Sequence, residues 1–189
     1  MEVRPTLFHV PGVNARSTRL LIDALAFAAY KHRLQRRKDP EASPYINHPI
    51  GLAHVLCDEA GITNARILAA AVLHDTIEDT ETTYEELRER FGNVVAGVVR
   101  EVSDDKTLTK AERKRLQIEH AEQLSRRARL VKLADKICNV RDVAANPPHD
   151  WSLARRREYF DWAKAVVDRI RGTNKRLEAA FDEAYAGRP

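Results

Sequence analysis

An apolar run that closes in a cluster of ionisable residues constrains this 189-residue chain more than any other segment. Residues 65–77 predict a helix that is apolar on nearly every side, which is typical of a buried central helix. The run ends in the letters HDTIED, which place His74, Asp75, Glu78 and Asp79 where the chain leaves the interior. Because desolvating an unpaired charge is costly, these groups need partners there. A divalent cation is one such partner, and arginine pairs combined with helix caps are the alternative.

Helical periodicity recurs along the rest of the chain and predicts an all-α fold. Aromatic residues make up only 6% of the sequence and charged residues 32%, so the β-branched and aromatic richness of a sheet protein is missing. We expect Ser17 or Thr18 to cap the first helix, Pro49 to occupy the first position of the second, and Thr63 or Asn64 to cap the third. The predicted helices span 17–32, 49–61, 65–77, 82–92, 94–102, 109–124, 130–144, 152–171 and 174–186.

The length suits one domain and is short for two. We expect an N-terminal arm over residues 1–17 and a single helical domain over residues 18–189. The arm has no apolar stretch fit for a signal peptide, and no run in the chain approaches a membrane span. Cys57 and Cys138 stand alone without metal-type spacing, which favours a reducing compartment and predicts a cytoplasmic protein.

The net charge of +4 fits either a solvated basic surface or an anionic ligand, and composition alone does not decide between them. The sequence shows no recognition helix and no aromatic platform, so we expect no nucleic-acid partner. Because no run is long and apolar enough for a membrane span, we expect no membrane partner either. The oligomeric state stays open.

Two further segments strengthen the case for a metal ion. His48, in NHPIG, stands just before a predicted helix start, and Asp135, in LADKICN, interrupts an otherwise apolar helical face. Adjacent His74 and Asp75 diverge by about 100° on a helix and can chelate one ion beyond its face. Two histidines and two aspartates suit Mn²⁺, Fe²⁺ or Zn²⁺ better than an all-oxygen site for Mg²⁺ or Ca²⁺.

Asp135 also allows a structural interpretation. A buried aspartate needs a compensating charge, and a salt bridge with Lys132 or Arg141 would supply it without a metal. The sequence leaves both interpretations open.

The order His48, then His74 and Asp75, then Asp135 resembles the H…HD…D signature of HD-domain phosphohydrolases. The segments QRRKDPEASPYINHPIG, LHDTIEDT, DDKTLTKAERKR, LVKLADKICNVRD and GTNKRLE look like the small, Mesh-type alarmone hydrolases, stand-alone relatives of the hydrolase half of RelA/SpoT enzymes. The resemblance covers about residues 21–178, although Cys138 stands where we expect an aromatic residue. It implies an all-α HD fold, Mn²⁺ or another divalent transition metal, and hydrolysis of guanosine 3′,5′-bis(diphosphate), (p)ppGpp, to GDP or GTP and pyrophosphate.

The resemblance also implies roles for individual residues. His48, His74, Asp75 and Asp135 are similar to the metal ligands of the family, and Glu78 with Asp79 to its catalytic acidic pair, which hydrolase-dead RelA-type domains have lost. We expect these two carboxylates to stand beside the metal and to orient the attacking water.

A substrate with two diphosphates requires cationic side chains around the metal. Tyr45 and Asn139 are candidates for base or ribose contacts, although Tyr45 could equally be a packing residue. The full set of candidate phosphate and nucleoside contacts is Arg36, Arg37, Lys38, Tyr45, Lys106, Lys110, Arg113, Lys114, Asn139 and Arg155.

Other functions fit the same core. Another HD nucleotide phosphohydrolase, such as an NADPH 2′-phosphatase or a 5′-nucleotidase, is the alternative within enzymes. A non-catalytic alarmone sensor is the alternative outside them, and the intact Glu78–Asp79 pair counts against it.

Overall fold

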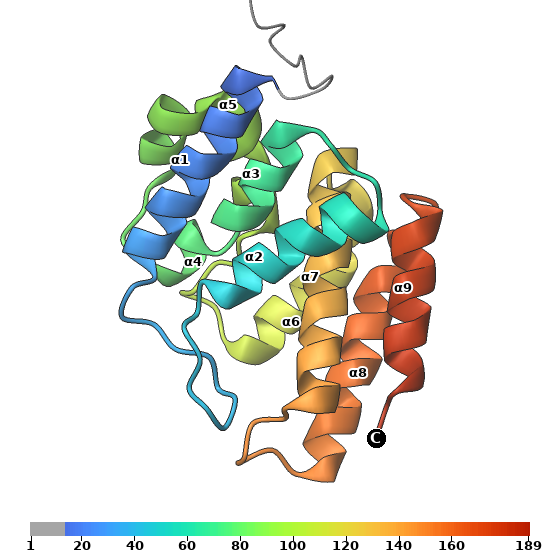
Figure 1. The fold of residues 1–189 in the computed structure, drawn as a ribbon. Helices are drawn as coiled ribbons and strands as arrows, with labels where there is room; N and C mark the ends of the chain where they lie inside the picture. The colour runs from blue at the N-terminus through green and yellow to red at the C-terminus, as the bar shows by residue number, and fades with distance from the viewer. Residues whose placement is uncertain (1–13) are drawn as a thin grey trace, which may run out of the picture.

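The computed structural model describes residues 14–189, and these residues form helices without any strand (Figure 1), which confirms the all-α class. Among them no helix combines the length and the apolar character that crossing a bilayer requires. The helices are α1 (Ala15–Lys31), α2 (Asn47–His54), a π-helical turn (Val55–Glu59), α3 (Ala65–Leu73), α4 (Thr76–Asp79), α5 (Tyr84–Val102), α6 (Lys110–Glu119), a 3₁₀ turn (Ala121–Gln123), α7 (Arg126–Ala145), α8 (Leu153–Asp168) and α9 (Lys175–Ala186).

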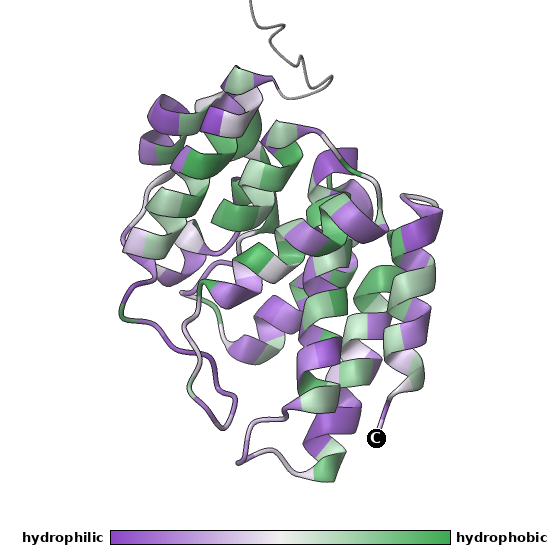
Figure 2. Ribbon diagram, in the orientation of Figure 1, coloured by the Kyte–Doolittle hydropathy of each residue, from purple (hydrophilic) through white to green (hydrophobic). Residues whose placement is uncertain are grey.

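Helix α3 is the centre of the core, as its apolar sequence predicts. Every residue from Ile67 to Leu73 is buried, and α1, α2, α5 and α7 all pack against this helix. Helix α7 packs against α8 and α9 as well, so it joins the two halves of the bundle (Figure 1). Figure 2 shows α3 as largely hydrophobic and α6 as largely hydrophilic. Helix α6 accordingly buries none of its residues and lies at the surface of the bundle.

The break at the end of α3 corrects the helix predicted over residues 65–77. The helix ends at Leu73, and His74 and Asp75 form a turn before α4 begins at Thr76. Asp75 has φ −97° and ψ 0°, a sparsely populated conformation in which active-site residues are often found. The Thr76 hydroxyl donates to the Leu73 carbonyl oxygen at 2.7 Å, which satisfies a backbone group that the break leaves free.

Two predicted helix starts near the N-terminus were wrong. The side chain of Asn14 caps α1 by accepting from the Arg16 N–H, so neither Ser17 nor Thr18 is the cap. Asparagine ranks among the best capping residues, and Ala15 favours helix, which explains the earlier start. Helix α2 begins at Asn47, which places Pro49 within the first turn instead of at its first position. Residues 1–13 of the predicted arm lie outside the described part of the chain, and residues 15–17 belong to α1.

Later boundaries follow local capping signals. Asn64, one of the two expected caps, caps α3, and Thr83 caps α5 and Thr109 caps α6 in a capping box with Glu112, close to the predicted starts at residues 82 and 109. Helix α6 ends at Glu119 instead of continuing to residue 124. Helix α7 begins at Arg126, earlier than the predicted residue 130, because the Ser125 side chain accepts from the Ala128 N–H. The predicted break at Gly92 is confirmed by its φ of 83°, which interrupts α5.

Candidate active site

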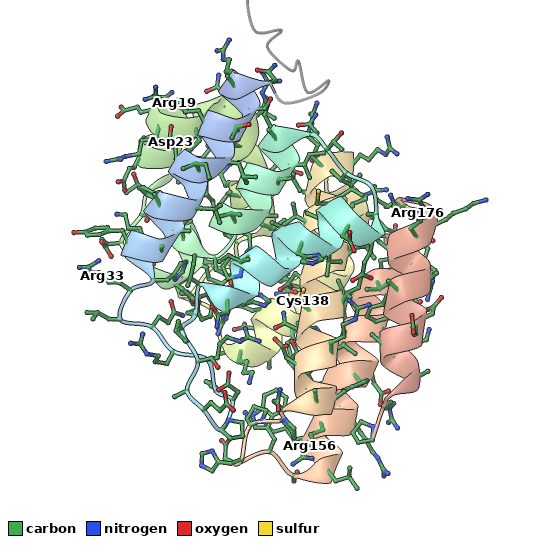
Figure 3. All side chains as sticks on the ribbon, viewed as in Figure 1. Arg19, Asp23, Arg33, Cys138, Arg156 and Arg176 are labelled. Carbon is green, nitrogen blue, oxygen red and sulfur yellow. The ribbon has the colours of Figure 1, made fainter. Side chains whose placement is uncertain are left out.

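Three buried side chains from separate elements converge at the centre of the fold. His48 lies in the first turn of α2, His74 follows α3, and Asp135 lies midway along α7, where Cys138 marks the helix in Figure 3. One ligand atom from each of the three lies within 4.8 Å of the others. The Asp135 Oδ1 atom is 3.4 Å from His48 Nε2 and 3.8 Å from His74 Nε2. These three atoms are close enough to one another to coordinate a single metal ion.

Asp75, the fourth predicted ligand, adjoins this cluster through His74. Its Oδ2 atom is 2.9 Å from His74 Nε2 and accepts a hydrogen bond from the Tyr45 hydroxyl. Burial alone would raise the pKa of Asp75. His74 and His48 favour the charged carboxylate, however, and hold this pKa below its usual range. Tyr45 therefore contacts a candidate ligand and does more than pack.

The donor set fits a divalent transition metal. His74 Nδ1 is 2.8 Å from the Ala71 carbonyl oxygen, so Nδ1 carries a hydrogen atom. The other ring nitrogen, Nε2, faces the carboxylates. Nε2 is buried, and although Asp75 Oδ2 lies 2.9 Å away, no described residue is aligned to form a hydrogen bond with it. Burial opposes protonation, yet Asp75 and Asp135 outweigh it and raise the pKa of His74 to about 9. The local field thus favours a cation at this position, and imidazole with carboxylate is a ligand set that such metals accept.

Asp135 is held from two sides. Asn139, one helical turn along α7, donates to Oδ1 at 2.6 Å, and the Lys136 ammonium donates to Oδ2 at 3.1 Å. Lys136 is buried and lies 4.2 Å from the centroid of the Trp162 ring. Burial would raise the pKa of Asp135, but Lys136 and the histidines hold it well below its usual range. No sequence pattern singled out Lys136, which is only a charged residue in a predicted helix.

The salt bridges considered for Asp135 from the sequence are not formed. Lys132 donates to the Val102 carbonyl oxygen at 2.9 Å, and Arg141 pairs with Glu59 at 2.6 Å. Neither cation is therefore the partner of Asp135, which pairs with Lys136.

The acidic pair lies in α4, directly after the His74–Asp75 turn. The Lys106 ammonium is 3.2 Å from Glu78 Oε1 and 2.7 Å from Asp79 Oδ1 and so bridges the two carboxylates. The Asp104 N–H donates to Glu78 Oε2 at 3.1 Å, and Gln35 donates to Asp79 at 3.1 Å. Burial raises the pKa of Glu78, and the backbone N–H of Asp104 opposes that rise.

These groups surround a small cavity that adjoins a large one. The small cavity has a volume of about 200 Å³ and is lined by the four candidate ligands and the acidic pair. The large cavity has a volume of about 900 Å³, which is in the range of nucleotide-sized sites. Six side chains line both cavities: Tyr45, His48, Asp79, Lys106, Asn139 and Tyr159.

The predicted substrate contacts divide between the large cavity and its surroundings. Arg37 lines the large cavity while pairing with Asp142 of α7, so one guanidinium anchors the loop to the helix. Arg113 instead lies 3.4 Å from Glu78 Oε1, the oxygen that Lys106 also contacts. The predicted residues that line the large cavity are Arg36, Arg37, Lys38, Tyr45, Lys106 and Asn139, whereas Lys110, Arg113, Lys114 and Arg155 line neither cavity.

Aromatic residues near the large cavity were missed from the sequence. Trp151 and Tyr159 line it, with ring centroids 5.3 Å apart. The Lys110 ammonium lies 5.9 Å and the Arg155 guanidinium 4.6 Å from the Trp151 ring, so both cations stand beside the cavity wall. Cys138 also lines the cavity, and burial raises the pKa of its thiol to about 12, which keeps it neutral.

Comparison with known proteins gives consistent matches. A family model described as HD domain matches residues 24–161. The chain is 55% identical to guanosine-3′,5′-bis(diphosphate) 3′-pyrophosphohydrolase MESH1 of Xenopus tropicalis, over 88% of this chain and 93% of the relative. It is 55% identical to the Homo sapiens protein of the same name, over 89% and 94%. A solved structure of a metazoan ortholog of SpoT that hydrolyses ppGpp superposes with a TM-score of 0.87 at 52% identity, covering 89% of this chain and 95% of that one.

Proposed function

This chain belongs to the HD-domain family, and we propose that within it the protein is a Mn²⁺-dependent (p)ppGpp 3′-pyrophosphohydrolase that releases GDP or GTP and pyrophosphate. The observation that carries the proposal is the pair of adjoining cavities. The small one is lined by the candidate ligands and acidic residues, and the large one, at about 900 Å³, has basic and aromatic walls. A 3′-diphosphate fits the first, and the rest of the nucleotide fits the second.

The candidate ligands would be His48, His74, Asp75 and Asp135. A bound divalent ion supplies the charge that acidifies an attacking water and polarises the phosphoryl oxygen. Asn139 and Lys136 hold Asp135 in place, and Tyr45 holds Asp75 through its hydroxyl. These contacts keep the ligand set oriented before substrate binds.

Glu78 and Asp79 would orient the attacking water and accept or return its proton. In the proposed reaction the water oxygen bonds to the phosphorus that bears the ribose 3′-oxygen, and the bond from phosphorus to that 3′-oxygen breaks. One water proton ends on the 3′-hydroxyl, and the other passes to pyrophosphate or solvent. Lys106 lies against both carboxylates and is positioned to move from them to the incoming phosphates.

A substrate panel tests the proposal. Metal-free protein supplemented with Mn²⁺ is incubated with ppGpp, pppGpp, NADPH and a deoxynucleotide monophosphate, and products are separated by anion-exchange chromatography. We expect ppGpp and pppGpp to yield pyrophosphate with GDP and GTP, respectively. Release of inorganic phosphate from NADPH with no turnover of ppGpp would instead make the protein a 2′-phosphatase. Binding of ppGpp without turnover would make it a sensor.

The proposed cellular setting also has support. Cys57 is exposed and Cys138 is buried, and both are free thiols, which fits the proposed cytoplasmic location. The proposal includes no nucleic-acid partner. Duplex DNA binding that weakens steeply as salt is raised would contradict that part.

A further inference from the structure

A third cavity adjoins the small one from another side. It has a volume of about 280 Å³ and shares Val102, Gln117 and Lys132 with the small cavity. Among the described residues it shares no lining side chain with the large cavity. The small cavity therefore lies between the other two, and the candidate metal centre has a nucleotide-sized space on one side and this third cavity on the other.

The walls of the third cavity favour water. Arg113 Nε and Gln117 Oε1 are buried atoms without a hydrogen-bond partner among the described residues, and both side chains line the cavity. Buried polar atoms are normally satisfied, and ordered water is the usual partner when protein groups are missing. Lys132 is buried in the shared wall, where its ammonium makes one hydrogen bond, to the Val102 carbonyl oxygen. The remaining ammonium hydrogens also require acceptors.

The third cavity is also connected to Glu78, the proposed acid–base residue. Glu78 Oε2 accepts from the Asp104 N–H at 3.1 Å, and Glu78 Oε1 lies 3.4 Å from Arg113. Asp104 and Arg113 both line the third cavity. Each oxygen of Glu78 thus contacts a residue of that wall, which places the carboxylate next to the third cavity.

We infer that the third cavity is the entry route of the attacking water, on the side of the metal centre opposite the nucleotide. The inference rests on the proposed function. In phosphoryl transfer the attacking and leaving oxygens lie roughly in line with phosphorus. A nucleotide in the large cavity directs its leaving 3′-oxygen to that side, so the water must approach from the other side. Val102, Gln117 and Lys132 form the boundary that this water crosses.

The third cavity carries charges of both signs. Glu101, Asp104 and Asp105 line it together with Arg113 and Lys132, so its walls offer a water molecule both acceptors and donors. The large cavity has more than three times its volume and is lined by Arg36, Arg37 and Lys38, which makes it the better exit for pyrophosphate.

Filling the third cavity tests the inference. Leu116 lines it from α6 and is half-buried, so Leu116→Trp should occupy part of its volume. With Mn²⁺-loaded protein and ppGpp, we expect kcat to fall about 10²-fold, the lower end of what acid–base catalysis contributes, while KM and Mn²⁺ affinity stay unchanged. Leu124→Trp, at a lining residue directly after the 3₁₀ turn, repeats the test if the first variant does not fold. Ile22→Trp, on the exposed face of α1, is the control for an added indole.

A partition experiment separates blocked entry from general damage. Methanol added to the assay competes with water as nucleophile and, by bonding through its oxygen to the same phosphorus, yields methyl diphosphate and GDP. This product ratio does not depend on how much enzyme is active. We expect Leu116→Trp to lower the ratio of methyl diphosphate to pyrophosphate, because methanol is larger than water. An unchanged kcat and ratio in a folded, filled variant would overturn the inference.

A high-resolution crystal structure tests the wet cavity independently of the reaction. We expect ordered waters within hydrogen-bond distance of Arg113 Nε and Gln117 Oε1. A dry third cavity would contradict the route even if ppGpp is hydrolysed. Ordered waters in a protein that does not hydrolyse ppGpp would instead leave the cavity description intact and refute the proposed function.

Discussion

At the scale of single residues, the two oxygens of Asp135 have different neighbours. Oδ1 faces His48 and His74, whereas Oδ2 receives the Lys136 ammonium. Lys136 is buried and lies over the Trp162 ring, so its position is fixed from a second side. Groups that orient a metal ligand in this way commonly matter for affinity nearly as much as the ligand itself.

Replacing Lys136 tests that role. Lys136→Met removes the hydrogen bond to Oδ2, and we expect Mn²⁺ affinity, measured by calorimetric titration, to fall about 10–100-fold. Lys136→Arg should retain more of the affinity, and Lys175→Met, at an exposed position on α9, should leave it unchanged. Tighter binding of Mn²⁺ by Lys136→Met would contradict this expectation. It would mean that repulsion between the ammonium and the metal outweighs the positioning effect.

The acidic pair gives a second prediction at this scale. Glu78→Gln with Asp79→Asn removes both proton acceptors but leaves the candidate ligands in place, since the pair lies in α4 and contacts Lys106. We expect turnover of ppGpp to fall by about 10²–10⁴ while the metal content measured by mass spectrometry stays near one ion. Glu85→Gln, on an exposed residue of α5, is the control. Loss of the metal from the double variant would show that these carboxylates are ligands.

At the scale of elements, the ends of helices position the chemistry. Helix α3 stops at Leu73, and the following turn directs His74 and Asp75 out of the apolar core toward α7. The short helix α4 then presents Glu78 and Asp79 beside them. Helix α5, which packs against α3, bends at Gly92, where φ is 83° and ψ is 165°. Only glycine adopts that conformation without strain.

Two glycines on α5 should respond in opposite ways to alanine. Gly92→Ala forces a side chain into the strained conformation and should lower the free energy of unfolding by about 1–3 kcal/mol. Gly97→Ala, in a regular part of the same helix with open space around it, should raise that free energy by about 0.5–1 kcal/mol. Urea denaturation of metal-free protein measures both. Equal effects at the two positions would mean that backbone conformation at Gly92 is not the cause.

At the scale of the whole molecule, the candidate metal would join elements that are distant in the sequence. His48 comes from α2, His74 from the end of α3 and Asp135 from α7, so one ion would link three helices. A ligand that binds only the folded state stabilises it by mass action. The metal centre should therefore contribute to stability as well as to catalysis.

Chelation should then lower both activity and melting temperature. Mn²⁺ at 100 times its Kd contributes about 2.7 kcal/mol, which corresponds to roughly 5–10 °C in Tm for a domain of this size. We expect exhaustive dialysis against a chelator to abolish ppGpp hydrolysis and to lower Tm by that amount, and added Mn²⁺ to restore both. His74→Ala is the control, because its Tm should not respond to the chelator. Full activity in metal-free protein would refute the metal-dependent mechanism.

From the sequence alone came the helical class, several helix starts and the four candidate ligands, three of which the fold brings within 4.8 Å of one another. Periodicity and capping act within a few residues, so the starts of α3, α5 and α6 were predicted to within two residues. The break after Leu73 was missed because His74 and Asp75 continue a helical pattern, and only their contacts with Tyr45 and Asp135 require a turn there.

The pairing of charged side chains depended on how the helices pack. Lys136, not Lys132 or Arg141, became the partner of Asp135, and Arg113 reached Glu78 across 35 positions of the chain. The packing of α6 and α7 against their neighbours also created the row of three cavities. The physical reason is range: helix signals lie in adjacent residues, whereas ion pairs and cavities depend on how whole helices pack, which no local pattern encodes.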